Sequence, residues 1–176
     1  LAVILDVHAK VDLLGYPEHS AGALMTTDYV SVHAELTVAE AMTFLRQQAR
    51  SRETIYYIYV VDDEHHLVGI ASLRDLILAD PGALIGEIMD REVISVGADQ
   101  DQEHVALQLA KFDFLAIPVV DSKTRLVGIV THDDVIDVVV EEATEDALRM
   151  GSVGAMAESY LQAPFTTVWR KRAAWL

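Results

Sequence analysis

Apolar residues follow two different spacings along the chain, and each spacing predicts a different kind of element. One helix is predicted where apolar residues recur every three or four positions, at Val38, Ala41, Met42 and Leu45. A second, less regular set marks another helix, at Val105, Leu107, Leu109 and Phe112. Two short, nearly continuous apolar runs, IYYIYVV (55–61) and LAIPVV (115–120), are typical of buried strands. The pattern therefore predicts an α/β fold.

Each strand run continues into a polar turn and a second apolar run. The segments VDDEHHLVGI (61–70) and VDSKTRLVGI (120–129) are predicted to be β-hairpins. Gly69 and Gly128 lie inside the second strands, where a glycine usually marks a close approach by backbone or ligand.

The two hairpins belong to an internal repeat. Residues 58–77 and 117–136 are offset by 59 and share ten identities in twenty positions, and residues 22–35 match 86–99 at an offset of 64. The first copy therefore carries five extra residues within 46–57. Ser72 and Thr131 take the same place in the two copies and are predicted to cap the helices that follow them.

Composition removes several classes of function. The chain has 176 residues, 28 acidic against 13 basic, and a formal charge of −15, which argues against a nucleic-acid partner. It has no cysteine, so disulfides and thiolate zinc sites are excluded. No P-loop, Gly-x-Ser-x-Gly or HExxH motif occurs, and we expect no enzymatic activity. The adjacent His65 and His66 lie in a predicted turn, where we expect exposed imidazoles and not a zinc or copper site.

The duplicated pattern, a strand ending in Asp, then LVGI and S/T-x-x-D, resembles the cystathionine-β-synthase (CBS) domain. The resemblance covers about residues 22–140 and implies tandem CBS domains, that is, two βαββα units forming a CBS pair, followed by a connecting helix. CBS pairs are regulatory modules that sense small ligands, often adenosine nucleotides, for an attached protein.

The flanking segments resemble the MgtE magnesium transporter family. LLGYPEHSAGALMT (13–26) is similar to its linker, EEATED (141–146) to its connecting "plug" helix, and WRKRAAWL (169–176) to the approach to its first membrane segment. The implied domains are the end of an N-terminal helical domain with a linker (1–21), CBS domain 1 (22–82), CBS domain 2 (83–140) and the connecting helix (141–176). The resemblance implies that the chain is a cytoplasmic region of an inner-membrane protein, cut from its membrane domain and from most of its N-terminal domain.

The acidic residues after the second repeat are the candidate metal ligands. On a helix, four of them would form one stripe of about 80°: Asp134, Asp137, Glu141 and Glu145. Such like charges oppose a helix unless a cation relieves them, and Mg²⁺ prefers oxygen ligands. The family resemblance implies Mg²⁺ binding at domain and dimer boundaries, to close a pore, by Asp101, Glu103, Asp113, Asp134, Asp137, Glu142 and Glu145.

Other interpretations of these acids stay open. An acidic run is often only a solvated helix face. Asp101 and Glu103 lie near a predicted helix start, where carboxylates are favourable without a metal, whereas Asp113 lies near a helix end, where a cation partner is more plausible. A metal-dependent phosphohydrolase using the same carboxylates is a further alternative.

A second ligand is also possible, and an adenine-nucleotide sensor serving another membrane protein is the alternative function. In nucleotide-binding CBS pairs the Asp of S/T-x-x-D holds the ribose, which implies Asp75, with Arg74 for phosphate and Tyr57 and Phe114 beside the base. Asp75 could instead be an early-helix charge and the two aromatic residues part of the core. The expected ligands are thus Mg²⁺ and, as a second candidate, ATP, and the expected assembly is a homodimer through the CBS pairs.

Overall fold

The chain divides into two units. The computed structural model describes residues 15–48, 55–136, 138 and 140. Residues up to Val135 form one compact unit, and the residues from Ile136 form a second, in which positions 136, 138 and 140 are helical. Within the described ranges, no helix combines the length and the hydropathy needed to cross a membrane.

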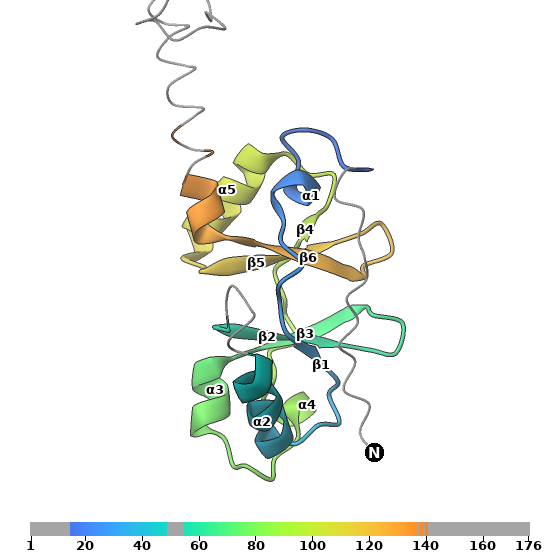
Figure 1. Cartoon of the computed structure of the whole chain (residues 1–176), viewed down its shortest axis with the longest axis vertical. Coiled ribbons are helices and arrows are strands. Elements are labelled where there is room, and N and C mark those ends of the chain that lie inside the picture. The colour runs from blue at the N-terminus through green and yellow to red at the C-terminus, as the bar shows by residue number, and fades with distance from the viewer. Residues whose placement is uncertain (1–14, 49–54, 137, 139, 141–176) are drawn as a thin grey trace, which may run out of the picture. The chain divides into compact units, whose positions relative to one another are not determined.

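The first repeat folds as a βαββα unit (Figure 1). Its elements are β1 (Ser31–Val32), α2 (Val38–Gln48), β2 (Tyr57–Val61), β3 (Leu67–Ser72) and α3 (Leu73–Leu78). The sheet has the order β1-β2-β3, with β1 parallel to β2 and β2 antiparallel to β3.

The second repeat has the same order of elements. These are β4 (Val96–Gly97), α5 (Gln102–Phe112), β5 (Ala116–Val120) and β6 (Leu126–Thr131), followed by helical residues 132–136. Its sheet, in the order β4-β5-β6, pairs in the same parallel and antiparallel sense. The predicted fold of two βαββα units is confirmed. The helices α2 and α5 start 64 residues apart and the strands β2 and β5 start 59 apart, so the five extra residues precede β2 as predicted.

Local hydrogen bonds explain where the helices begin. The Ser72 side chain accepts the N–H of Asp75, and the Asp75 carboxylate accepts the N–H of Ser72 over 2.9 Å, which completes a capping box at α3. Glu40 makes the same return bond to the N–H of Thr37 at α2. At the matching position of the second repeat, the Thr131 hydroxyl donates to Asp134 over 2.5 Å.

The buried face of α5 differs from the prediction. Val105 and Leu109 are buried as expected, but Leu107 is 68% exposed and Phe112 is 37% exposed. Ala106 is buried instead, in the same core cluster as Ala21. The small side chain at position 106 is therefore part of the core that α5 shares with the neighbouring helix α1 (Ala21–Leu24), and the larger Leu107 turns to solvent.

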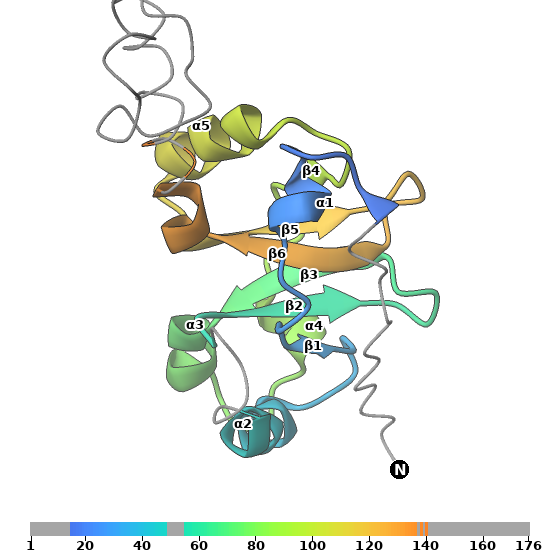
Figure 2. The same cartoon turned by 45° about the horizontal axis from the view of Figure 1, so that its top comes forward.

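Each repeat receives a short helix from outside its own βαββα pattern. The helix α1 lies ahead of β1 at the start of the first repeat but packs against α5, β4 and β6 of the second. The helix α4 (Ile85–Ile88) lies ahead of β4 at the start of the second repeat but contacts β3 of the first (Figure 2). Accordingly, Met25 lies in the core of the second repeat and Ile85 in the core of the first.

The two strand glycines lie where these exchanged segments arrive. A Cβ atom on Gly128 would meet the Met25 sulfur at 2.6 Å, and a Cβ on Gly69 would meet the Met89 sulfur at 2.4 Å. The predicted close approach is present, and it is made chiefly by methionine side chains, with the Asp90 carbonyl oxygen also 3.2 Å from the position of a Gly69 Cβ. The glycines therefore serve packing between the repeats.

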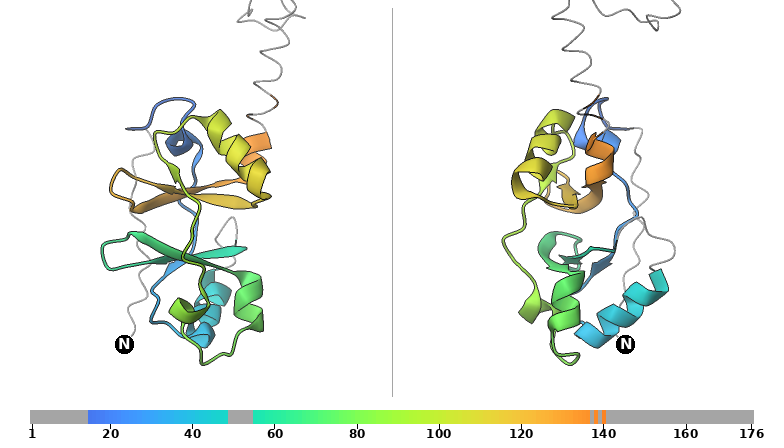
Figure 3. Two further views of the ribbon diagram at one scale, coloured as in Figure 1. Left: turned by 180° about the vertical axis from the view of Figure 1, so that it is seen from behind. Right: turned by 90° about the vertical axis from the view of Figure 1, so that its left-hand side faces the viewer.

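The hairpins of the two repeats lie against each other (Figure 3). The N–H of Leu67 donates to the carbonyl of Thr124 over 3.2 Å, and the N–H of Leu126 donates to the carbonyl of His65 over 3.0 Å. A third hydrophobic cluster, which takes residues from both sheets, contains Tyr29, Tyr59, Val61, Ala116, Leu126 and Ile129. The first unit is therefore held together by both backbone pairing and apolar packing between its repeats.

Candidate functional site

A cavity of about 220 Å³ opens where the first repeat, the segment after α4 and the start of β5 meet. Three of the four predicted nucleotide residues, Tyr57, Asp75 and Phe114, line it. The fourth, Arg74, lines an adjoining open groove of about 590 Å³, which shares Tyr57 and Ser72 with the cavity. We call these two hollows the cavity and the groove. The structure thus brings the predicted nucleotide residues to one place.

The capping box of α3 fixes the position of Asp75. Both the N–H and the hydroxyl of Ser72 donate to the same carboxylate oxygen, Oδ2, over 2.9 and 2.6 Å. Among the described residues, the other oxygen accepts no hydrogen bond. Asp75 is therefore an early-helix capping residue, and it also keeps an acceptor that a ligand hydroxyl could use.

The two aromatic residues likewise combine two roles. Tyr57 and Phe114 are half-buried; Tyr57 packs against the cluster between the sheets and Phe114 against the core of the second repeat. Phe114 also stacks on Phe112, with ring centroids 5.5 Å apart. Because packing fixes both rings where they line the cavity, a flat purine base could bind against them with little ordering cost.

Two acidic residues in the cavity were not predicted. Asp90 and Glu92 line it together with Asp75, and they come from the segment between α4 and β4. The backbone of Asp90 pairs with Ile70 of β3, donating over 2.8 Å and accepting over 2.9 Å. Nothing in the sequence marks these residues, because only the pairing of this segment with β3 brings them to the cavity.

The predicted metal ligands on α5 lie at its two ends. Asp101 is the N-cap, and its carboxylate accepts the N–H of Glu103 over 2.8 Å. Asp113 is the C-cap in the left-handed conformation, with φ 54°. An 11-residue helix separates these ends by about 16 Å at ~1.5 Å per residue, so Asp101 and Asp113 cannot share one ion within a chain.

The remaining predicted ligands follow β6. Asp134 is half-buried, and its Oδ2 accepts a hydrogen bond from the Thr131 hydroxyl. One of its two carboxylate oxygens is therefore already bonded within the chain. Asp137, Glu142 and Glu145 lie outside the described residues. The predicted ligands within the described part of the chain are Asp101, Glu103, Asp113 and Asp134. None of these four belongs to a cluster of three potential metal-binding side chains there. Their predicted role at boundaries between domains or subunits stays a prediction.

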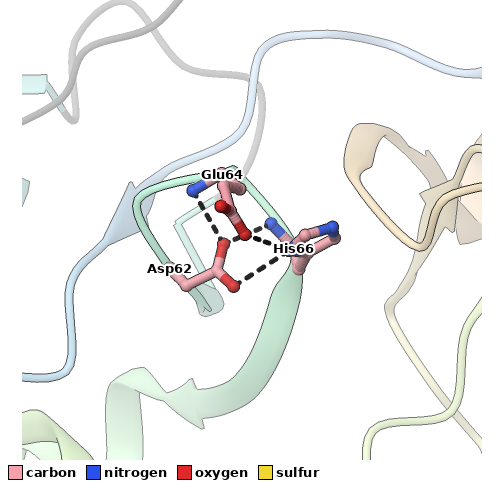
Figure 4. Close-up of side chains that lie close together, drawn as sticks. All are labelled: Asp62, Glu64 and His66. Carbon is pink, nitrogen blue, oxygen red and sulfur yellow. Dashed lines mark hydrogen bonds and ion pairs between the residues drawn. The ribbon is translucent and has the colours of Figure 1, made fainter.

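One such cluster occurs among the described residues, in the hairpin between β2 and β3. It is formed by Asp62, Glu64 and His66, whose ligand atoms lie within 4.8 Å of one another (Figure 4). His66 Nδ1 lies 2.9 Å from Asp62 Oδ2, and the backbone N–H groups of Glu64 and His66 donate to Oδ1. Burial raises the pKa of Asp62, but the hydrogen bonds from His66 and the backbone outweigh it and leave this pKa below its usual value. The internal bonds account for the geometry of the cluster.

The two histidines of this turn are less exposed than predicted. His65 and His66 are both half-buried, and His65 Nε2 lies 3.3 Å from the Tyr29 hydroxyl. Burial, followed by the nearby His33, lowers the pKa of His65. The prediction of exposed side chains was wrong, because the His65 ring lies beside the Tyr29 hydroxyl and the His66 ring beside the Asp62 carboxylate.

Comparison with known proteins agrees with this architecture. The family model of the CBS domain matches residues 21–82 and 85–141. The chain is 50% identical over 169 residues to the magnesium transporter MgtE of Thermus thermophilus, covering 96% of this chain and 38% of that protein. It therefore spans less than half the length of this relative.

Two solved structures share the fold. One is the soluble part of a magnesium transporter, at 54% identity and a TM-score of 0.74, covering 75% of this chain and 52% of that one. The other is the cytosolic domain of the Mg²⁺ channel MgtE in complex with ATP, at 55% identity and a TM-score of 0.71, covering 72% of this chain and 51% of that one.

Proposed function

The chain belongs to the CBS domain family and contains a CBS domain pair of the MgtE type, and on this premise we propose that it is the cytoplasmic Mg²⁺-sensing region of a magnesium transporter. The observation that carries the proposal is the 50% identity to an MgtE protein, which extends through 96% of the chain and so includes the acidic segment after β6 as well as the CBS pair.

The proposed mechanism is an electrostatic clamp between acidic surfaces. With a formal charge of −15, such surfaces repel one another, and a divalent cation relieves this repulsion when it binds between them. Asp134 lies shortly after β6, and Asp113 and Asp101 lie at the two ends of α5. Mg²⁺ shared between these surfaces, or between the two chains of a homodimer, would draw the connecting helices together and close the pore.

A Mg²⁺ titration of the whole 176-residue chain tests the clamp. We expect millimolar Mg²⁺, relative to chelator, to slow proteolysis and to reduce the radius measured by small-angle scattering. Asp134→Asn combined with Asp137→Asn should weaken this response, because the amides keep the shape but lose the charge. Glu35→Gln, which neutralises an exposed acid before α2, is the matched control and should respond like the unmodified chain.

Identical scattering and proteolysis with and without Mg²⁺ would contradict the proposal. A response of equal size in the Asp134→Asn, Asp137→Asn chain would leave Mg²⁺ binding intact but remove these two residues from it.

We also propose that the cavity and the groove together bind an adenine nucleotide. Tyr57 and Phe114 would hold the base, Asp75 the ribose hydroxyls, and Arg74 the phosphates in the groove. The 55% identical MgtE domain whose structure contains ATP supports this second ligand. Calorimetry with ATP and with Mg²⁺ in separate titrations distinguishes the two proposals, because a nucleotide-only sensor would give heat with ATP and no response to Mg²⁺.

A further inference from the structure

The cavity and the groove carry opposite charges. Among the described residues, the charged side chains that line the cavity are all acidic: Asp75, Asp90 and Glu92. The charged side chain that lines the groove is Arg74. Because Tyr57 and Ser72 line both hollows, a ligand that spans them would meet three carboxylates on one side and one guanidinium on the other.

Backbone pairing holds the two unpredicted carboxylates at the cavity. Asp90 forms an isolated bridge with Ile70 through two backbone hydrogen bonds, and its Oδ1 accepts the N–H of Glu92 over 2.9 Å. The nearby basic residue Arg91 does not line the cavity, and its guanidinium donates to the carbonyl of Gly86 over 3.1 Å. Among the described residues, Arg91 therefore forms no ion pair with either of the two carboxylates beside it.

We propose that Asp90 and Glu92 tune specificity at this site: their charges weaken the binding of phosphorylated purine nucleosides and strengthen that of positively charged ones, relative to neutral nucleosides. This inference rests on the proposed nucleotide site and adds the charge of the ligand to it. Arg74 in the groove offsets part of the negative potential of the cavity for a bound phosphate.

Three ligands that differ only in the charge of the group at the 5′ position test this proposal. Adenosine, AMP and 5′-amino-5′-deoxyadenosine are neutral, negative and positive at the 5′ position at neutral pH. Calorimetric titrations are done in chelator, so that no divalent cation neutralises the carboxylates. The chains compared are the unmodified protein, the double variant Asp90→Asn with Glu92→Gln, and Glu35→Gln as a control that removes one acid away from the cavity.

The double variant should change the affinities in opposite directions. We expect AMP to bind about three- to tenfold more tightly and the amine about three- to tenfold more weakly, as expected for nearby charges largely exposed to water. Adenosine should change less than about twofold, which also shows that the cavity is intact, since the amide oxygen introduced by Asp90→Asn can still accept the backbone N–H of residue 92. The variant Arg74→Gln should do the reverse for AMP and weaken its binding.

Two results would overturn the inference. If AMP and the amine shift in the same direction, or if both stay within about twofold, Asp90 and Glu92 do not select charge, while the nucleotide site itself stands. If the unmodified chain binds none of the three ligands, the nucleotide site is refuted and this inference with it.

Discussion

Met25 and Gly128 share a space that admits only one side chain. Three Met25 side-chain atoms would lie 2.6 to 3.0 Å from a Cβ on residue 128, and one of them is the Met25 Cβ, which cannot move without its backbone. We expect Gly128→Ala to lower the free energy of unfolding by about 1–3 kcal/mol, the usual cost of overpacking, measured by urea denaturation.

Two further variants show whether this loss comes from overpacking. Gly15→Ala is the control, because nothing lies within 4 Å of a Cβ there. Combining Gly128→Ala with Met25→Ala should cost less than the sum of the two single changes, because the methionine side chain causes the clash. Additive losses would contradict this explanation.

Asp121 and Arg125 form an ion pair in the second hairpin, with Nη2 2.6 Å and Nε 2.8 Å from Oδ2. Burial raises the pKa of Asp121, but the bonds from Arg125 and from the backbone N–H groups outweigh it, so this pKa lies below its usual value. A lowered carboxyl pKa stabilises the fold above the unfolded value of about 4, and this contribution is lost as the pH falls through the lowered pKa.

We therefore expect Asp121→Asn to cost about 1 kcal/mol at neutral pH and to reduce the loss of stability between about pH 5 and pH 2. Urea denaturation at several pH values measures both effects. If the variant and the unmodified chain lose the same stability on acidification, the carboxylate of Asp121 does not contribute in this way. Glu35→Gln, which leaves the ion pair intact, should keep the full acid dependence.

The sequence predicted the close approach at the strand glycines but not the residues that make it. Gly69 and Gly128 break a strand pattern, so a close approach at these positions was predictable. The approaching methionines were not, because Met25 and Met89 reach the glycines only after α1 and α4 have packed on the opposite repeat. Local sequence patterns do not predict contacts between residues that lie far apart in the sequence.

At the scale of the element, two substitutions of Asp101, the N-cap of α5, can separate its two proposed roles. It caps α5 by accepting the N–H of Glu103, and it is also a predicted Mg²⁺ ligand. Asparagine caps a helix as well as aspartate does but lacks the charge. We expect Asp101→Ala to cost about 1 kcal/mol in urea denaturation, whereas Asp101→Asn should leave stability nearly unchanged.

The same two variants then report on the metal. If Asp101 binds Mg²⁺ at a boundary, Asp101→Asn should weaken the Mg²⁺ response measured by proteolysis, although the helix is intact. An undiminished response in Asp101→Asn would assign the residue to capping alone.

The helices themselves were easier to predict than the faces that they bury. Apolar spacing located α2 and α5, and Ser72 marked the start of α3. On α5, however, Leu107 is exposed and Ala106 is buried. Hydrophobicity ranks leucine above alanine, but the buried face of α5 is set by the shared core that α1 enters, and α1 lies far from α5 in the sequence.

At the scale of the whole molecule, ligand binding should appear as added stability. A ligand at about one hundred times its dissociation constant adds about 2.7 kcal/mol to the free energy of unfolding if it binds only the folded state. We expect ATP to do so for the unmodified chain, and Phe114→Ala to abolish most of the effect at the same ATP concentration. Denaturation with and without ATP measures it.

Leu107→Ala is the matched control for this measurement, since Leu107 lies on α5 and lines neither the cavity nor the groove. An equal gain from ATP in the Phe114→Ala and Leu107→Ala chains would place the nucleotide elsewhere.

The candidate site was predictable only where a motif marked it. Tyr57, Asp75 and Phe114 follow from the CBS resemblance, and they do meet at one cavity. Asp90 and Glu92 belong to no motif, and their place there depends on the bridge between Asp90 and Ile70. The fold was more predictable than the site, because the repeat is visible in sequence whereas the convergence of three separate segments is not.

The exchange of α1 and α4 between the repeats also constrains how the protein forms during synthesis. Ala21 and Met25 leave the ribosome early, but their partners on β6, as far as Thr131, leave more than one hundred residues later. The first repeat must likewise wait for Ile85 before its own core is complete. The core of the first repeat is therefore incomplete until α4 has been made, and a nascent chain stalled before Ile85 would expose this unfinished core to chaperones and proteases.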